Sequence, residues 1–360
     1  MRKPNFASGP CALPLPVLRE IQNDIIEYCD SSESILEISH RSSHFARILE
    51  SAKLNLRRFA SIPDSHEILF LQGGASTQFS QVVMHFKSCG KAMDYIVSGT
   101  WSRKAFEECK RMGGNCNLVQ EIDGKEKFDV TLWNWSSDTG FVYFCDNETV
   151  DGIEMPKCFI DLIPSRCPII CDMSSNFLTR EVQFEKYGII FAGAQKNLGI
   201  AGLTLVVIRK DVLNMKIDPN TPIMSKYSTF SSSDSLYNTP PTFAIYVCDL
   251  MVKWLIEEFH TLSRVELFHQ ETQRKLYDII DNPENHFFNS IYYRSRINIV
   301  FRILDADGKF DLEAENKFAE TNLLLNMKGH RSVGGLRVSL YNSVTMSDIS
   351  QLFEYILNRN

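Results

Sequence analysis

The sequence predicts an α/β protein with a large domain on a mostly parallel sheet and a smaller α+β domain at its C-terminal end. Between residues 67 and 209, short apolar runs alternate with helical stretches, and several runs end in small or polar residues. Short unbroken apolar runs are typical of parallel strands that are buried on both faces. After residue 246 the pattern changes to long helical stretches with two isolated strand-like runs, which indicates a second unit.

Strands of the large domain are expected at 67–71, 94–98, 141–146, 168–172, 188–192 and 203–209, after a first helix at 17–28. The C-terminal part predicts helices at 242–259, 262–280 and 311–324 and strands at 295–303 and 335–340. Four prolines within residues 1–16 predict an extended arm that packs with the small domain. The expected domains are therefore 17–245 and 246–360. The stretch 114–137 matches no element.

Composition excludes several classes of protein. Of the 360 residues, 44% are hydrophobic and 23% charged, as in ordinary soluble globular proteins. The net charge of −6 argues against nucleic-acid binding, and no apolar run approaches the roughly 18 residues that cross a bilayer. The ten cysteines form no Cys-x-x-Cys pair and no zinc-ligand spacing, and no signal peptide precedes them. We expect reduced thiols, a cytoplasmic location and no metal.

Lys196 is the first candidate for chemistry. It follows the apolar run 188–192, so its ammonium group stands at the end of a buried strand. Burial favours the neutral amine, which is a nucleophile able to form a Schiff base with a carbonyl compound or with pyridoxal phosphate. The ordinary alternative is a lysine at the point where a strand meets water.

Asp172 ends the expected strand 168–172, at the same carboxyl edge of the sheet as Lys196. A carboxylate there caps the next loop or keeps a pyridinium nitrogen protonated, so that the ring acts as an electron sink. The two residues together favour the second interpretation.

A phosphate site is predicted after the strand 67–71. The stretch 71–79 reads Leu-Gln-Gly-Gly-Ala-Ser-Thr-Gln-Phe, a glycine turn followed by a hydroxyl-capped helix start. Backbone amides at Ala75 and Ser76, with the hydroxyl of Ser76 or Thr77, would bind an anion at such a helix N-terminus. The stretch lacks the Gly-Lys-Ser/Thr ending of a Walker loop, and a simple N-cap remains the alternative.

Aromatic and cationic residues complete a candidate pocket. Trp101 follows a strand and would stack on a flat cofactor, although a core position is the alternative. Thr149 follows another strand end and would bond an oxygen of the cofactor. Two His-Arg pairs, one at residues 40–41 and one at 330–331 followed by Arg337, predict a basin for dianions.

These motifs resemble one family over nearly the whole chain: phosphoserine aminotransferases, which are class V aminotransferases of pyridoxal-phosphate fold type I. The resemblance rests on the stretches 5–10, 37–42, 71–79, 145–149, 172–176, 191–197, 237–243 and 329–337. It implies transamination between L-glutamate and 3-phosphooxypyruvate, giving O-phospho-L-serine and 2-oxoglutarate in serine biosynthesis. It leaves open a second substrate, 4-phosphohydroxythreonine of vitamin B6 biosynthesis.

The resemblance also implies a role for each residue. Lys196 would form the Schiff base with pyridoxal 5′-phosphate, Asp172 would pair with the pyridine nitrogen and Trp101 would stack on the ring. The phosphate and the phenolic oxygen would be held by Ala75, Ser76, Thr149 and Gln195, and, from the other subunit of a homodimer, by Asn238 and Thr239. Substrate anions would bind Ser8, His40, Arg41, His330, Arg331 and Arg337. Position 76 is Ser where some members carry Arg.

Two rival functions are a desulfurase or lyase on the same fold and a non-catalytic binding protein. A desulfurase needs a mobile thiol near the site, and Cys11 is the cysteine next to a motif. A scaffold has no need of Lys196, Asp172 and both His-Arg pairs, so we expect an enzyme.

Overall fold

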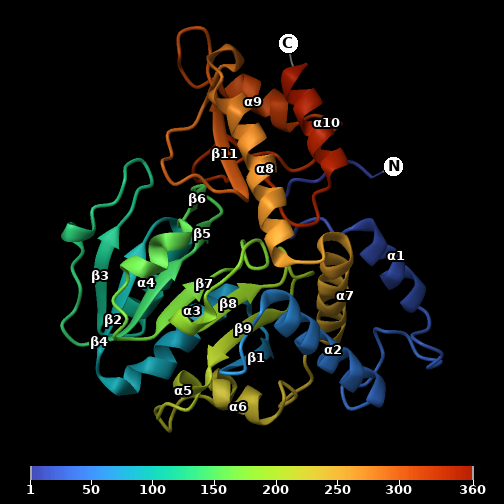
Figure 1. Ribbon diagram of the computed structural model, residues 1–360, viewed down its shortest axis with the longest axis vertical. Helices are drawn as coiled ribbons and strands as arrows, with labels where there is room; N and C mark the ends of the chain where they lie inside the picture. Colours follow the sequence, from blue (N-terminus) through green and yellow to red (C-terminus); the bar gives the residue numbers. More distant parts are fainter. Residues whose placement is uncertain (1, 359–360) are drawn as a thin grey trace.

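A large mixed sheet and a small antiparallel sheet organise the chain in the computed structural model, which describes residues 2–358 (Figure 1). The large sheet contains, in spatial order, β1 (His66–Leu71), β9 (Thr204–Arg209), β8 (Tyr187–Gly193), β7 (Ile169–Asp172), β4 (Thr139–Cys145), β2 (Ala92–Val97) and β3 (Cys116–Glu121). Strand β9 runs antiparallel to both of its neighbours, and the other neighbouring pairs are parallel. The predicted α/β fold with a mostly parallel sheet is confirmed.

Helices cover both faces of the large sheet because its strands are apolar on both sides. In β8, Ile190 faces one core while its neighbours Ile189 and Phe191 face the other. Helices α2 (Ser43–Ala60) and α7 (Thr242–Phe259) pack on the first face, and α3 (Gly74–Phe86) and α4 (Thr100–Arg111) on the second.

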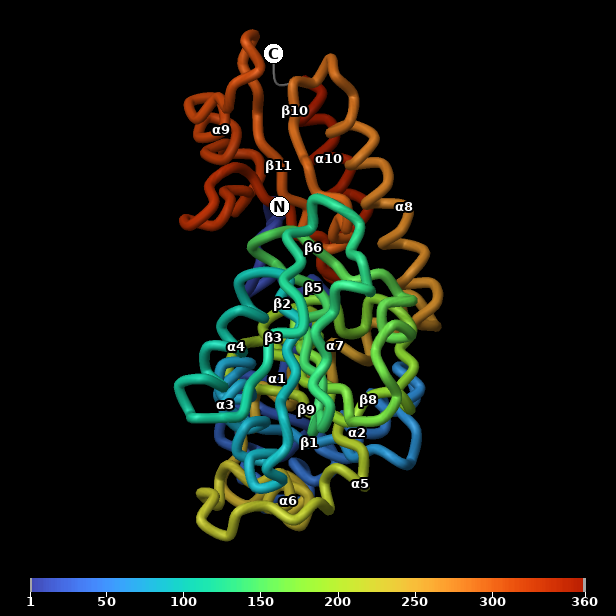
Figure 2. Tube along the Cα trace, turned by 90° about the vertical axis from the view of Figure 1, so that its left-hand side faces the viewer, coloured from blue at the N-terminus to red at the C-terminus, as the bar shows by residue number. Residues whose placement is uncertain are grey.

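The small sheet lies beyond one end of the large sheet, as the side view in Figure 2 shows. It consists of β10 (Phe287–Phe288), β11 (Asn298–Ile303) and β12 (Leu336–Ser339), and its core is shared with α8 (Leu262–Asp281), α9 (Leu312–Ala319) and α10 (Met346–Leu357). The N-terminal arm joins this unit: the Phe6 amide donates to the Leu325 carbonyl at 3.0 Å, and the Ser339 amide donates to the Phe6 carbonyl at 3.2 Å.

The remaining elements are α1 (Leu15–Asp24), β5 (Asn147–Glu148), β6 (Ile153–Glu154), α5 (Lys210–Leu213), α6 (Tyr227–Ser232) and short 3₁₀ turns at Lys87–Cys89, Val130–Leu132, Lys157–Leu162, Phe184–Lys186, Ile223–Ser225 and Pro283–Asn285. Strands β5 and β6 form a hairpin at the carboxyl end of β4.

Three expected elements differ from the structure, and one stretch contains a strand that was not expected. The first helix begins at Leu15, helped by a proline in its first turn, and ends at Asp24 rather than at residue 28. The stretch 114–137, which predicted no element, contains β3. The helix expected at 311–324 ends at Ala319, and the strand expected from 295 begins at Asn298.

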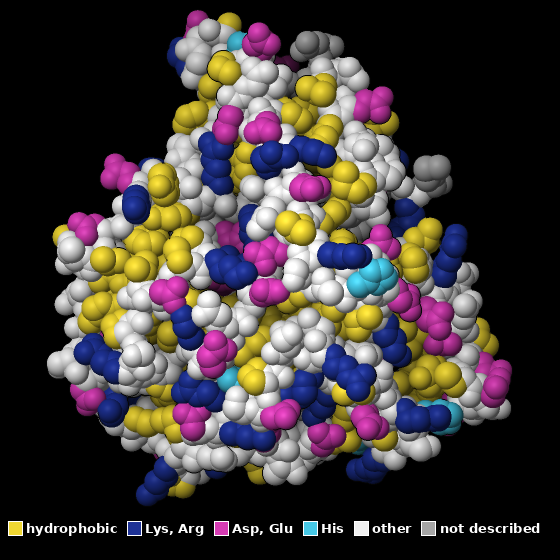
Figure 3. All heavy atoms as spheres, viewed as in Figure 1, with side chains coloured by type: hydrophobic (Ala, Val, Ile, Leu, Met, Phe, Trp, Pro, Cys, Tyr) yellow, Lys and Arg dark blue, Asp and Glu magenta, His cyan; other side chains and the backbone are white. Residues whose placement is uncertain are grey.

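The surface agrees with a modest net charge. On the face shown in Figure 3, acidic and basic side chains are intermixed without a large area of one sign. Within the described residues, no helix is both long and apolar enough to span a bilayer. The division at residues 16 and 245 remains a prediction. Helix α7 packs in the core of the large sheet, and the start of α8 adds Leu262 and Val265 to the same core.

Candidate active site

The carboxyl ends of β7 and β8 border a cavity of about 320 Å³, which the N-terminal arm and the small unit also line. Among the predicted site residues, the cavity brings together Ser8, Ala75, Ser76, Trp101, Thr149, Asp172, Gln195, Lys196, His330 and Arg337. Cavities at this edge of an α/β sheet are the usual place for ligands.

Lys196 stands in the turn that follows β8 and is 9% exposed. Burial lowers the pKa of its amine below the ordinary value, and the negative charge of Asp172 opposes this shift. Asn197 fixes the turn from both sides: its Nδ2 donates to the Ser175 carbonyl at 2.9 Å, and its Oδ1 accepts from the Asn342 amide at 3.0 Å. The amine is therefore held in a defined place.

Asp172 is the last residue of β7 and is buried. Its Oδ1 accepts a hydrogen bond from the Ser174 amide at 2.9 Å. Burial raises the pKa of this carboxyl, and the positive charge of Lys196 opposes the shift. A buried carboxyl of this kind stays ionised best beside a cation.

The glycine turn before α3 has the geometry of an anion site. Gly73 and Gly74 have φ angles of 95° and 67°, and a Cβ on Gly73 would lie 2.1 Å from Thr77 Oγ1. The Thr77 hydroxyl donates back to the Gly73 carbonyl at 3.0 Å. The first turn of α3 thus presents Ala75 and Ser76 to the cavity, while the hydroxyl of Thr77 is already bonded within the turn.

Trp101, Thr149 and Arg337 form one connected wall. The indole Nε1 of Trp101 donates to Thr149 Oγ1 at 2.9 Å, and Arg337 Nη1 donates to the Thr149 carbonyl at 2.8 Å. Lys196 Nζ lies 5.9 Å from the centroid of the Trp101 ring. Burial lowers the pKa of Arg337, whose guanidinium still carries a charge at neutral pH.

Five predicted residues lie outside the cavity of their own chain. His40 is half-buried and Arg41 exposed in the turn before α2; Asn238 and Thr239 are exposed after α6; Arg331 is exposed beside His330. His330 Nδ1 is hydrogen-bonded to Ser332 Oγ at 2.6 Å.

Sequence reasoning missed the polar residues that support the site. The Asn147 side chain donates to Ser175 Oγ at 2.7 Å and to Asn298 Oδ1 at 2.8 Å, and accepts from Ser295 Oγ at 2.6 Å. It therefore links the cavity wall to the small sheet. The position of Asn147 in the strand-end motif 145–149 is the sequence feature that could have identified it.

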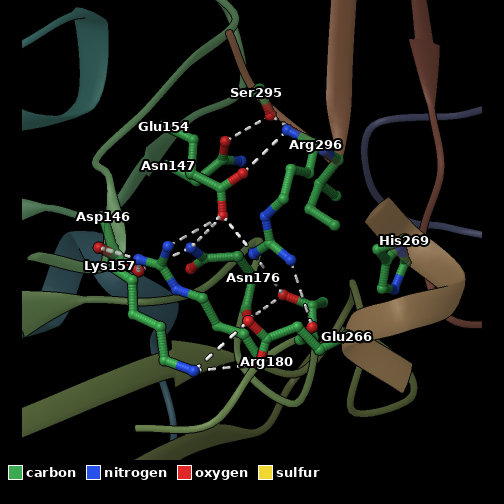
Figure 4. Close-up of polar contacts among 12 residues, drawn as sticks. Asp146, Asn147, Glu154, Lys157, Asn176, Arg180, Glu266, His269, Ser295 and Arg296 are labelled. Carbon is green, nitrogen blue, oxygen red and sulfur yellow. Dashed lines mark hydrogen bonds and ion pairs between the residues drawn. The ribbon is translucent and has the colours of Figure 1, made fainter. Parts of the chain in front are cut away.

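A buried cluster of charges lies beside Asn147 (Figure 4). Arg180 contacts both oxygens of Asp146, at 2.8 and 2.7 Å, and Arg296 Nη2 donates to Glu154 Oε1 at 2.7 Å. Asn176 Nδ2 bridges the two carboxylates, at 2.7 and 3.1 Å. Arg296 precedes β11, so the cluster joins the β5–β6 hairpin to the small unit.

The thiol next to the site is not a free nucleophile. Cys11 Sγ donates to the Lys196 carbonyl at 2.7 Å, and burial raises the pKa of this thiol to about 12. A desulfurase needs a thiolate that reaches the substrate, so this geometry disfavours that alternative.

Comparison with known proteins agrees with the fold. The family model "Aminotransferase class-V" matches residues 5–352, which makes the chain a class V aminotransferase. The chain is 42% identical to a probable phosphoserine aminotransferase of Dictyostelium discoideum, covering 98% of this chain and 96% of that protein. It is 38% identical to the phosphoserine aminotransferase of Drosophila melanogaster, covering 98% and 97%. The solved structure of the PLP-bound phosphoserine aminotransferase of Trichomonas vaginalis matches with a TM-score of 0.91 and 40% identity over 99% of this chain and all of that one (100%). The chain belongs to the phosphoserine aminotransferases.

Proposed function

We propose that this protein transfers the amino group of L-glutamate to 3-phosphooxypyruvate, reversibly, giving O-phospho-L-serine and 2-oxoglutarate. The observation that carries this proposal is the buried pair of Lys196 and Asp172 in a cavity that Arg337 also lines. Membership of the family supports the choice of substrates.

The residues present fit pyridoxal 5′-phosphate. The cavity places a buried amine, a buried carboxylate and the N-terminus of α3 around one space. Ala75, Ser76 and Gln195 would hold the phosphate, Thr149 the phenolic oxygen, Asp172 the ring nitrogen and Trp101 the face of the ring. When bound, the cofactor supplies an aldehyde that condenses with amines and a ring that accepts the electron pair released with the α-proton.

Lys196 supplies the proton transfer. Its Nζ would take the proton from the substrate α-carbon, and burial favours the neutral amine that this step needs. The Asp172 carboxylate would keep a proton on the ring nitrogen. The Arg337 guanidinium would bind the α-carboxylate that both substrates share, in the two-point geometry typical of arginine.

The distal anion is a carboxylate in one substrate and a phosphate in the other. Ser8 and His330 line the cavity, and Arg331 stands next to it on the same loop. We propose that the remaining predicted residues act across a homodimer, because they lie outside the cavity of their own chain. In this proposal Asn238 and Thr239 reach the cofactor phosphate, and His40 and Arg41 the substrate, in the site of a second copy.

We also propose a cytoplasmic location. All ten cysteines lie in the described part of the chain and are free thiols, which suits a reducing compartment. The same anion-binding residues would also bind the phosphate of 4-phosphohydroxythreonine, which we propose as a further substrate.

The visible absorbance of the cofactor-loaded protein tests the proposal. Glutamate should bleach the absorbance of the lysine-bound cofactor, and 3-phosphooxypyruvate should restore it. Lys196→Ala should lower kcat by about 10²–10⁴-fold, the range for loss of a positioned acid–base group. Turnover of Lys196→Ala at the wild-type rate would show that another group moves the proton.

Two variants separate substrate binding from cofactor binding. Arg331→Ala and His40→Ala should weaken phosphoserine binding more than cofactor binding. Equal losses of both would contradict the role of these residues in binding the distal anion.

A further inference from the structure

We propose that Glu148 is a positioning residue that orients Trp101 toward the cofactor by holding the backbone from which the indole projects. The proposal rests on the stacking role of Trp101 in the proposed function. Glu148 itself is not among the residues that line the cavity, and it contacts neither substrate nor cofactor in the proposed function.

Glu148 binds the N-terminus of α4 with both of its carboxylate oxygens. Its Oε2 accepts from the Trp101 amide at 2.8 Å, and its Oε1 accepts from the Ser102 amide at 2.8 Å and from the Ser102 hydroxyl at 2.6 Å. The residue is fully buried. Three donors on one carboxylate fix the start of the helix in both position and rotation.

The following residue in the chain holds the other end of the same tryptophan. Thr149 Oγ1 accepts from the indole Nε1 at 2.9 Å. Glu148, the last residue of β5, thus binds the backbone of Trp101, and Thr149, which follows it, binds the indole ring. The Thr149 carbonyl also accepts from Arg337, so one segment orients the stacking residue and the proposed carboxylate-binding residue together.

Two lysine side chains lie near the indole ring. Lys104 Nζ lies 4.3 Å from the centroid of the Trp101 ring, and Lys196 Nζ lies 5.9 Å from it. Lys104 is exposed on α4, whereas Lys196 lies buried at the cavity. Lys196 also lines the cavity, so the Trp101 ring lies between the surface helix α4 and the candidate site.

A helix cap alone does not require this arrangement. A serine or aspartate at the N-cap position ordinarily binds the free amides of a helix, but Gly99 occupies that position here. A Cβ on Gly99 would lie 2.7 Å from Glu148 Cγ and 2.5 Å from Asp151 Oδ2, so the glycine makes room for carboxylates from another segment. The carboxylates of Glu148 and Asp151, on either side of Thr149 in the chain, therefore cap the helix in place of an N-cap side chain.

Asp151 provides a matched control. Its Oδ2 accepts from the Thr100 amide at 2.8 Å, so it caps the same helix end one residue before Trp101. Loss of either carboxylate removes a cap of the same helix. The loss of Glu148 is distinguished by its effect on the tryptophan.

The experiment uses the full chain labelled with 5-fluorotryptophan and read by ¹⁹F NMR, first without cofactor. The sequence contains four tryptophans, and Trp101→Phe assigns the signal of interest. Glu148→Gln places an amide NH₂ against backbone donors, so it should shift or split the Trp101 signal and leave the other three in place. Asp151→Asn should leave the Trp101 signal unchanged while lowering the melting temperature.

The loaded protein gives the second reading. Glu148→Gln should weaken affinity for pyridoxal phosphate about tenfold, as expected for loss of a hydrogen bond to a charged group, and should reduce the visible circular dichroism of the bound cofactor. Asp151→Asn should retain both. If Glu148→Gln does not fold, Glu148→Asp gives the same readings, since its shorter carboxylate keeps the charge but loses the reach.

The outcomes separate the two proposals. An unchanged Trp101 signal in both Glu148 variants, or an equal change in Asp151→Asn, would overturn the positioning role. If Trp101→Phe and Trp101→Ala leave the visible circular dichroism of the cofactor unchanged, the stacking role fails instead. The signal of the cofactor-free protein still reports on Glu148 in that case.

Discussion

Replacement of Arg180 by methionine should strongly destabilise the protein. The Arg180 side chain is 11% exposed and contacts Asp146, which is 3% exposed, through both carboxylate oxygens. Methionine fills part of the volume and leaves the buried carboxylate without its cation. Loss of one partner from a buried ion pair costs about 3–5 kcal/mol. That is a large part of the roughly 5–15 kcal/mol that stabilises a typical protein.

Urea denaturation followed by far-ultraviolet circular dichroism at pH 7 measures this cost. The double variant Arg180→Met/Asp146→Asn should recover about half of the loss, because it removes the uncompensated charge. Arg209→Met is the control, since Arg209 pairs with Asp211 at the surface, where such pairs contribute about 0–1 kcal/mol.

Two results would refute this reasoning. One is a cost below about 1 kcal/mol for Arg180→Met, which would mean that water or another cation reaches the carboxylate. The other is a double variant no more stable than Arg180→Met alone, which would assign the loss to packing rather than to charge.

Three further predictions concern acid stability, substrate binding and thiol reactivity. Burial lowers the pKa of His269 from 6.5 to about 4, so the folded chain binds a proton at this imidazole less tightly than the unfolded chain does. The free energy of unfolding should keep its full value above pH 6.5 and fall by up to about 3 kcal/mol toward pH 4. The variant His269→Gln should lose this pH dependence in urea denaturation. Arg337→Lys should raise KM for both the amino acid and the oxo acid by about tenfold or more, with unchanged cofactor absorbance, since lysine cannot form the two-point contact; a change confined to one substrate would argue against a shared carboxylate site. Iodoacetamide at pH 8 should label exposed Cys29 and spare Cys11, because burial raises the pKa of the Cys11 thiol to about 12. Mass spectrometry after a brief exposure measures the order of labelling, and faster labelling of Cys11 than of Cys29 would contradict this prediction.

The strands of the large sheet could be predicted because most of them are apolar on both faces. Strand β3 was not predicted, because it lies at the edge of the sheet and one of its six residues, Val119, is buried. Its polar sequence, Cys-Asn-Leu-Val-Gln-Glu, carries no unbroken apolar run. Edge strands often escape prediction for this reason.

The cavity residues that bear charge or a π-system could be predicted from the ends of strands. Glu148 and Asn147 could not, although they stand inside a recognised motif, because their partners lie far away in the sequence. Asn147 bonds Asn298, 151 positions along the chain, and Glu148 bonds Ser102, 46 positions back. Local patterns contain no information on such pairings.

The N-terminal arm has a consequence for how the enzyme is made. The Phe6 amide donates to the Leu325 carbonyl, and the Phe6 carbonyl accepts from the Ser339 amide. The Cys11 amide donates to the carbonyl of Gln195, next to Lys196. During translation at about 5–20 residues per second, the first residues wait roughly 15–65 s before residue 325 is made. Ser8, which lines the cavity, therefore reaches its place only after the segment 325–339 has been made. The active site is completed by an arm that is made well before the segments it binds.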